Sequence, residues 1–294
     1  MTDTRGKKRR TGWIVFAAIL LLIAVLALIA LDQRIETTEY TVSFPTLPAG
    51  WDGVRIALVA DPHGNGMTEG ETELLQALQN THPDYIFCLG DMLNEKEPDF
   101  DGFLCAMRAF AGIAPTYMVS GNHDRWTEWE GSYFAYYRKF TSLCGQAGVT
   151  LLEDASVLLR RGGDDVRLIG FADPEFWSSD GDGSMSKTVE SLPGTDDFDV
   201  LLFHRANLFP QVAGQGYELV CSGNLLGGVV RIPLIGPVFR RLPVGEMTYA
   251  GGVYELSDTV LVSSRGLGNN TAVPRVFNRP ELVILTLKRE GKVS

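Results

Sequence analysis

The chain has 294 residues, of which 45% are hydrophobic, so it is long enough for one large domain with a substantial core. Its formal net charge is −10, and the basic residues near the N-terminus leave the remainder more acidic still. Contacts with the phosphates of nucleic acid need clustered cations. A domain this acidic is a poor partner for nucleic acid, and we predict no nucleic-acid binding.

A basic cluster opens the chain and an uncharged apolar segment follows it. Residues 13–31 carry no charge, and as a helix they would extend about 28 Å, close to the hydrocarbon thickness of a bilayer. The basic residues should stay in the cytoplasm and place the rest of the chain outside. A cleaved signal peptide is the alternative, although its apolar region is usually shorter, about 7 to 15 residues. We favour a single-pass anchor and predict a cytoplasmic segment at 1–12, a transmembrane helix at 13–31, a stalk with a lead-in strand at 32–50 and one domain at 51–294.

Three apolar runs that read as buried strands each end in polar residues. The strand at 54–60 ends in Asp61-Pro62-His63, the strand at 85–89 in Gly90-Asp91, and the strand at 116–120 in Gly121-Asn122-His123-Asp124. Amphipathic helices are predicted between them, at 68–80 and around Phe103, Met107 and Phe110. Parallel strands joined by right-handed crossovers bring their polar ends to one sheet edge, where open α/β sheets build their sites. We therefore expect these side chains to converge: Asp61, His63, Asp91, Asn122 and His123.

The later part of the chain predicts one more helix packed on this unit and then a second sheet. Residues 126–147 read as a helix with an aromatic stripe, Trp126, Trp129, Tyr133 and Tyr137, which is either core packing or a wall beside the cleft. After Gly148, strands are predicted at 149–152, 156–159, 166–171, 200–203, 217–221, 252–256, 260–263 and 282–287, with a helix at 185–192 and a polar loop at 178–183. We expect this half to supply a sheet that faces the first.

The four cysteines give no metal-binding spacing. Cys88 and Cys221 lie in apolar strand-like runs, where a free thiol packs as a small apolar group. A disulfide between Cys105 and Cys144 is left open, since disulfides form outside the cytoplasm.

The order and spacing of the three strand-end motifs resemble the calcineurin-like metallophosphoesterase family. Leu201-Leu202-Phe203-His204 is similar to that family's fourth motif, a strand that ends in a metal-binding histidine, and the resemblance covers roughly residues 52–288. With the N-terminal anchor, it extends to the bacterial membrane-associated phosphodiesterase branch, in the cytoplasmic membrane with the catalytic domain outside. It implies a four-layer α/β/β/α sandwich of two mixed sheets.

The resemblance also implies roles for individual residues. Asp61 and His63 would hold a first metal ion, Asp91 would bridge two ions, and Asn122 and His204 would hold the second. His123 would face the substrate, with Asp124 orienting it. The implied cofactors are two divalent ions, or failing that one, of manganese, iron, zinc or magnesium, which can clamp a displacement at phosphorus.

The chain departs from the family at the fifth motif, Gly-His-x-His. The matching stretch is Gly223-Asn224-Leu225-Leu226, so both histidines are missing; Asn224 can still offer an oxygen, whereas Leu226 cannot be a ligand.

Two hypotheses about function follow. One is a metal-dependent phosphoesterase that cleaves a phosphodiester or phosphomonoester, with a lipid headgroup as one candidate because Arg231, Arg240 and Arg241 flank an apolar segment at 232–239. The other is a weakened or inactive membrane-tethered protein that binds a phosphorylated ligand.

Overall fold

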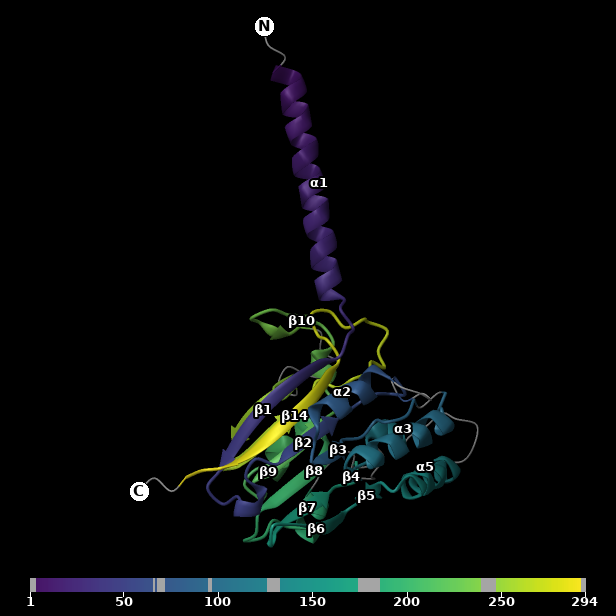
Figure 1. Cartoon of the computed structure of the whole chain (residues 1–294), viewed down its shortest axis with the longest axis vertical. Helices are drawn as coiled ribbons and strands as arrows, with labels where there is room; N and C mark the ends of the chain where they lie inside the picture. Colours follow the sequence, from purple (N-terminus) through teal and green to yellow (C-terminus); the bar gives the residue numbers. More distant parts are fainter. Residues whose placement is uncertain are drawn as a thin grey trace.

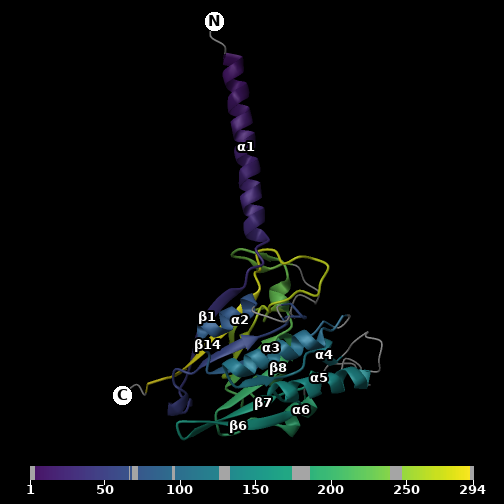
Figure 2. The same ribbon diagram turned by 45° about the vertical axis from the view of Figure 1, so that its right-hand side comes forward.

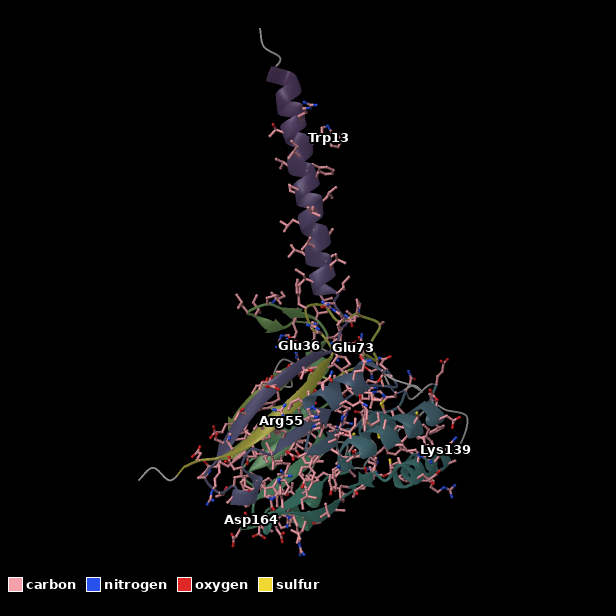
Figure 3. All side chains as sticks on the ribbon, viewed as in Figure 1. Trp13, Glu36, Arg55, Glu73, Lys139 and Asp164 are labelled. Carbon is pink, nitrogen blue, oxygen red and sulfur yellow. The ribbon has the colours of Figure 1, made fainter. Side chains whose placement is uncertain are left out.

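One long helix stands apart from an α/β body (Figure 1). The computed structural model describes residues 4–65, 67, 72–94, 97–125, 133–173, 186–238 and 247–291. Helix α1, Thr4–Ala30, exposes its apolar side chains, among them Trp13 (Figure 3). The part from Arg10 to Ala30 is long and apolar enough to cross a membrane, and a signal sequence would have the same character.

Six strands of the described residues form the first sheet, in the order β1-β14-β2-β3-β4-β5. Strands β2 to β5 are parallel, β14 runs antiparallel to β2, and β1 runs parallel to β14, so the sheet is mixed. Their bounds are β1 Glu36–Phe44, β2 Arg55–Val59, β3 Tyr85–Cys88, β4 Thr116–Met118, β5 Thr150–Leu151 and β14 Glu281–Arg289.

Helices α2 (Glu73–Thr81), α3 (Phe100–Ile113) and α5 (Tyr133–Ala147) cover the outer face of the first sheet (Figure 2). The hydroxyl of Thr72 accepts the Leu75 amide and caps α2, and Asp99 accepts the Gly102 amide and caps α3. Short helix α4, Asn122–Arg125, follows β4. The predicted start of α2 at 68–71 lies outside the described residues.

The aromatic residues of α5 pack into the core. Tyr136 and Phe140 are fully buried against α3 and the sheet, whereas Tyr137 is half-buried at the edge of that face. The described aromatics thus favour core packing, one position away from the predicted stripe. Trp126 and Trp129 lie outside the described residues.

The second sheet faces the first across a continuous apolar layer. Its order among the described residues is β12-β13-β9-β8-β7-β6, with parallel pairs from β7 to β13 and antiparallel edge strands. Leu58 and Phe87 of the first sheet meet Leu168 and Leu202 of the second in one core cluster. The bounds are β6 Ala155–Arg161, β7 Asp164–Gly170, β8 Asp199–Arg205, β9 Leu219–Gly223, β12 Gly252–Leu256 and β13 Thr259–Ser263.

Helices α6 (Ser186–Ser191) and α7 (Phe209–Val212) lie on the outer face of the second sheet, where Val189 and Phe209 share a cluster with Phe203. This completes the predicted four-layer α/β/β/α sandwich. The remaining elements are a two-stranded hairpin and three 3₁₀ helices, namely β10 Arg231–Ile232, β11 Gly236–Pro237, η1 Ala49–Trp51, η2 Ala206–Leu208 and η3 Leu226–Gly228. The predicted polar loop at 178–183 lies outside the described residues.

Two strands predicted for the second sheet belong to the first. These are β5 and β14, and β14 lies between β1 and β2. Val283 and Leu285 face the layer between the sheets, whereas Leu282 and Ile284 face the helices. Since both faces of β14 are apolar, a central position in a covered sheet is the one that buries it.

All four cysteines are free thiols, so the disulfide left open between Cys105 and Cys144 is absent. Cys88 and Cys221 are fully buried among apolar side chains, as predicted.

Candidate metal centre

The polar strand ends meet at one edge of the two sheets. Asp61 follows β2, Asp91 follows β3, Asn122 follows β4, and His204 lies near the end of β8. The backbone turns sharply at these positions, since Asp61 and Asp91 have φ of 50° and 53°, in the left-handed region that most side chains avoid. Backbone strain of this kind is often concentrated at functional sites.

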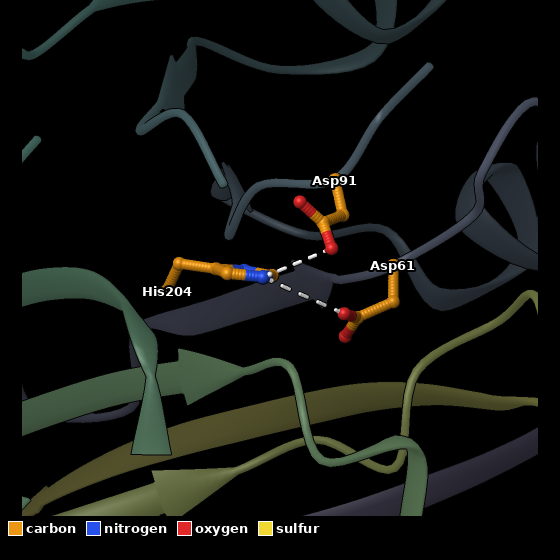
Figure 4. Close-up of side chains that lie close together, drawn as sticks. All are labelled: Asp61, Asp91 and His204. Carbon is orange, nitrogen blue, oxygen red and sulfur yellow. Dashed lines mark ion pairs between the residues drawn. The ribbon is translucent and has the colours of Figure 1, made fainter. Parts of the chain in front are cut away.

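Two carboxylates and one imidazole form the centre of the cluster. His204 Nε2 lies 3.1 Å from Asp91 Oδ2 and 3.8 Å from Asp61 Oδ1 (Figure 4). Each of the three residues offers one ligand atom, and these atoms all lie within 4.8 Å of one another. The other ring nitrogen, His204 Nδ1, lies 2.7 Å from the carbonyl oxygen of Leu89. Because a carbonyl can only accept, Nδ1 donates there, which orients Nε2 toward the carboxylates.

Two more histidines stand beside Asp91. His63 Nε2 and His123 Nε2 lie 3.7 Å and 3.9 Å from Asp91 Oδ2. Their rings meet edge to face, with centroids 5.1 Å apart. The His123 amide donates to Asp91 Oδ1 at 2.8 Å, so backbone and side chain of this residue both contact the same carboxylate.

Glycines make room for this cluster. A Cβ at Gly90 would lie 2.7 Å from His204 Nδ1, and one at Gly121 would overlap Asp91 Oδ1. Gly90 also has φ of 94°. The two glycines therefore keep side chains out of the centre, and neither position has space for alanine.

Asp124 is a fully buried carboxylate that holds backbone in place. Oδ1 accepts the amides of Met92 and Leu93, and Oδ2 accepts the amide of Gly121 at 2.9 Å. These bonds tie the loop after β3 to the loop after β4, and thus fix Asp91 relative to Asn122. The role predicted for Asp124, orienting the His123 ring, stays a prediction.

The stretch predicted to correspond to the fifth motif, residues 223–226, contacts the centre through its backbone. The Asn224 amide donates to both oxygens of Asp61, at 3.1 Å and 3.0 Å. Leu226 is 5% exposed, and its carbonyl accepts a hydrogen bond from the Asn278 side chain. The Leu226 side chain is apolar and cannot bind a metal ion. The correspondence of this stretch with the family's fifth motif stays a prediction, and so does the ligand role of the Asn224 side chain.

Burial and mutual charge shift the ionisation of the cluster. Burial raises the pKa of Asp61 to about 7. Burial would also raise the pKa of Asp91, but His204 and the other histidines outweigh it and hold that pKa well below its usual range. Burial alone would lower the pKa of His204, but the charges of Asp91 and Asp61 outweigh it and raise that pKa to about 10. For His63, burial outweighs the opposing charge of Asp91, so its pKa falls to about 4 and its ring is neutral at pH 7.

The donor set fits a divalent cation. Two buried atoms that have no hydrogen-bond partner within the described residues are His63 Nδ1 and Asn122 Oδ1. Buried polar atoms are nearly always paired, so unpaired donors and acceptors of this kind near two carboxylates fit a site that binds a cation. Carboxylate, imidazole and amide oxygen are ligands of manganese, iron, zinc and magnesium.

The sequence reading missed three residues around the centre. Asp173 is buried just after β7, and its oxygens accept two bonds from Arg205, at 2.7 Å and 2.8 Å. The rule that polar residues at strand ends converge would have found Asp173.

The other two residues lie in the loop before β14. Asn270 Nδ2 lies 2.8 Å from His123 Nε2. Arg275, 1% exposed, donates to the carbonyls of Gly266 and Gly268 beside Asp61. Neither Asn270 nor Arg275 stands in a periodic segment, so no pattern pointed to them.

The fold and the site together are those of a metal-dependent phosphoester hydrolase. The family model for calcineurin-like phosphoesterase matches residues 54–225, more than half of the chain. The chain belongs to this family, whose members use divalent metal ions.

The chain is also similar to individual proteins. The chain is 26% identical over 261 residues to the uncharacterized metallophosphoesterase YkuE of Bacillus subtilis, covering 87% of this chain and 86% of that protein. It is 25% identical over 206 residues to the phosphodiesterase YaeI of Escherichia coli, covering 70% of each. Among solved structures, the phosphopantetheinyl hydrolase of Mycobacterium tuberculosis is similar over 74% of this chain and 91% of that one, with 12% identity and a TM-score of 0.48.

Proposed function

We propose that this protein is a membrane-anchored phosphoesterase that hydrolyses a phosphodiester or phosphomonoester with one or two divalent ions. The observation that carries the proposal is the buried group of Asp61, Asp91 and His204, whose ligand atoms converge within 4.8 Å. A relative named as a phosphodiesterase favours a diester substrate.

We assign the residue roles as the family resemblance implies them. Asp61 and His63 are suited to hold a first ion, Asp91 to bridge, and Asn122 and His204 to hold a second, with the Asn224 side-chain oxygen as a further ligand. When bound, divalent ions lower the pKa of a coordinated water and neutralise charge on the phosphoryl oxygens. His123 lies 3.9 Å from Asp91 and is 13% exposed, so it can both reach the centre and meet a substrate. It is placed to stabilise a phosphoryl oxygen or to protonate the leaving group.

The location is part of the proposal. Helix α1 would cross the bacterial cytoplasmic membrane once, with the basic N-terminus inside and the body, residues 51–294 with its lead-in strand, outside. This arrangement corresponds to the membrane-associated phosphodiesterase branch and makes a lipid headgroup a candidate substrate.

Turnover of bis-(p-nitrophenyl) phosphate tests the activity. The purified full chain with Mn²⁺ should cleave it, and Asp91→Asn should remove this activity. Asp165→Asn is the matched control. Asp165 lies on the hairpin of β6 and β7, and its side chain is exposed and pairs with Arg160. No turnover with any divalent ion would overturn the proposal.

A second function is favoured by one observation, the buried Leu226 at the position where the resemblance implies a metal-binding histidine. The chain would then be a tethered binding protein for a phosphorylated ligand, with one ion or none. Two tightly held ions per chain by elemental analysis would exclude this reading. Reinstating histidines with Asn224→His and Leu226→His should raise turnover if the rest of the site is intact.

A further inference from the structure

The hairpin of β10 and β11 projects large apolar side chains into solvent. Outside α1, Leu234 and Ile235 are the most exposed large apolar side chains of the described residues, at 108% and 73%. Ile232 and Val238 on the same hairpin are also exposed. Scattered apolar side chains are normal on a surface, but a contiguous group at the tip of a projection marks a contact site.

The backbone at the tip makes this apolar residue costly. Leu234 has φ of 69°, in the left-handed region where glycine or asparagine is usual. The turn is nevertheless formed, since the Ile235 amide donates to the Ile232 carbonyl at 3.0 Å and Ile232 pairs with Gly236. A fully exposed leucine gains no packing from the described residues that would offset its conformation. The choice of leucine therefore points to a partner outside the described chain.

The base of the hairpin is bonded to the segment that holds the end of α1. The Arg231 amide donates to the Val276 carbonyl at 2.9 Å, and the next residue, Phe277, donates its amide to the Ala30 carbonyl at 2.7 Å. The Arg231 guanidinium also donates to the carbonyls of Gly227 and Ala250. The hairpin is thus fixed beside the foot of α1, as Figure 1 shows.

The metal centre lies at the same end of the first sheet. Glu36, six residues after the end of α1, pairs with Glu281 at the start of β14. Leu58, three residues before Asp61, pairs with Val283 on the same strand. The strand ends that carry the site are therefore the ones nearest the anchor, and Glu36 lies at the foot of α1 in Figure 3 whereas Asp164 lies at the opposite end of the body.

We infer that the hairpin Arg231–Val238 is a second membrane contact, which inserts Leu234 and Ile235 into the headgroup region of the bilayer that α1 crosses. The contact keeps the site edge turned toward the lipid surface. Burial of apolar side chains at that depth is the ordinary driving force of interfacial elements. The inference rests on the proposed anchor. Because the hairpin and the end of α1 lie on the same side of the body, a bilayer is favoured over a protein partner or a second copy.

An environment-sensitive probe tests the contact in the full chain. Leu234→Cys is labelled with a nitrobenzoxadiazole dye in a Cys105→Ser background, because the other three thiols are buried and burial raises their pKa values. Leu158→Cys is the matched control, because Leu158 is a half-exposed leucine on the hairpin of β6 and β7. The labelled proteins are reconstituted into vesicles of phosphatidylglycerol and phosphatidylcholine with a doxyl lipid quencher, and aqueous iodide serves as the second quencher.

The expected result is loss of roughly half of the fluorescence to the doxyl lipid at position 234, with almost none at position 158. Iodide should quench 158 and spare 234. Retention of the chain in the vesicles without doxyl quenching at 234 overturns the hairpin contact, including the case in which 234 is shielded from both quenchers by protein. Equal doxyl quenching at both positions also overturns it, because the body would then be adsorbed without orientation. Release of the chain by alkaline carbonate overturns the anchor itself, and the hairpin contact with it.

Discussion

The side-chain amide of Asn270 lies 2.8 Å from His123 Nε2, although 147 residues separate the two in sequence. An amide N–H can only donate, so the imidazole accepts at Nε2 and its other nitrogen carries the proton. Asn270 therefore fixes both the orientation and the tautomer of the histidine that we place against the substrate.

Replacing Asn270 should lower turnover more than substrate affinity. In Asn270→Ala the His123 ring loses this partner, and kcat for bis-(p-nitrophenyl) phosphate should fall by about tenfold, a positioning effect rather than loss of the acid itself. KM and the content of bound metal should change little. Asn80→Ala, on the exposed face of α2, is the matched control. An unchanged kcat would show that the contact does not position His123.

The ion pair between Asp173 and Arg205 should contribute to stability. Both oxygens of Asp173 are bonded to the guanidinium, and both side chains are largely buried. Asp173→Asn leaves the charge of Arg205 without its carboxylate and should reduce the free energy of unfolding by about 2 kcal/mol. Denaturant unfolding measures this change. The control is Asp165→Asn, which breaks the exposed pair with Arg160 and should cost less than about 0.5 kcal/mol. Equal effects of the two substitutions would contradict the argument.

Metal binding should release protons, and more of them below pH 7. In the metal-free site the pKa of Asp61 is about 7 and that of His204 about 10, so both carry protons at pH 6 whereas His204 alone does at pH 8.5. Ligands must be deprotonated, so binding of Mn²⁺ should release about two protons at pH 6 and about one at pH 8.5, and affinity should rise with pH, more steeply below pH 7. Calorimetric titrations in two buffers of different ionisation enthalpy measure the release. In Asp61→Asn it should stay near one at both pH values. Affinity that is independent of pH would contradict the assignment of these two groups as ligands.

Two glycine substitutions should have opposite effects. Gly121→Ala places a methyl group against Asp91 Oδ1 and the amide of Asp91, so it should remove metal binding and destabilise the fold. Gly112→Ala in α3 meets open space and should stabilise the protein by about 0.5–1 kcal/mol, because alanine favours the helix. Melting temperatures with and without Mn²⁺ measure both effects. A Gly121→Ala protein that keeps its metal-induced rise in melting temperature would show that the close approach is not needed.

Most of the sandwich could be predicted because its strands are buried and its helices are amphipathic. The convergence of Asp61 and Asp91 followed from a geometric rule about parallel strands, which needs no knowledge of the loops. His204 was predicted to join them only through the family resemblance. The placement of β14 could not be predicted, since strand order depends on tertiary packing rather than on local pattern. Asn270 and Arg275 lie in an aperiodic loop whose path is set by contacts distant in sequence. The turn at Leu234 could not be predicted either, because leucine is not a residue that local propensity places at positive φ.

The central claim is that Asp61, Asp91 and His204 hold a divalent cation in common. The most direct test is anomalous X-ray scattering at the manganese edge from crystals of the protein grown with Mn²⁺. We predict a strong anomalous peak in contact with the Asp91 carboxylate and His204 Nε2, which disappears in Asp91→Asn. No peak between these three side chains, in crystals where they keep the positions seen in Figure 4, would contradict the account.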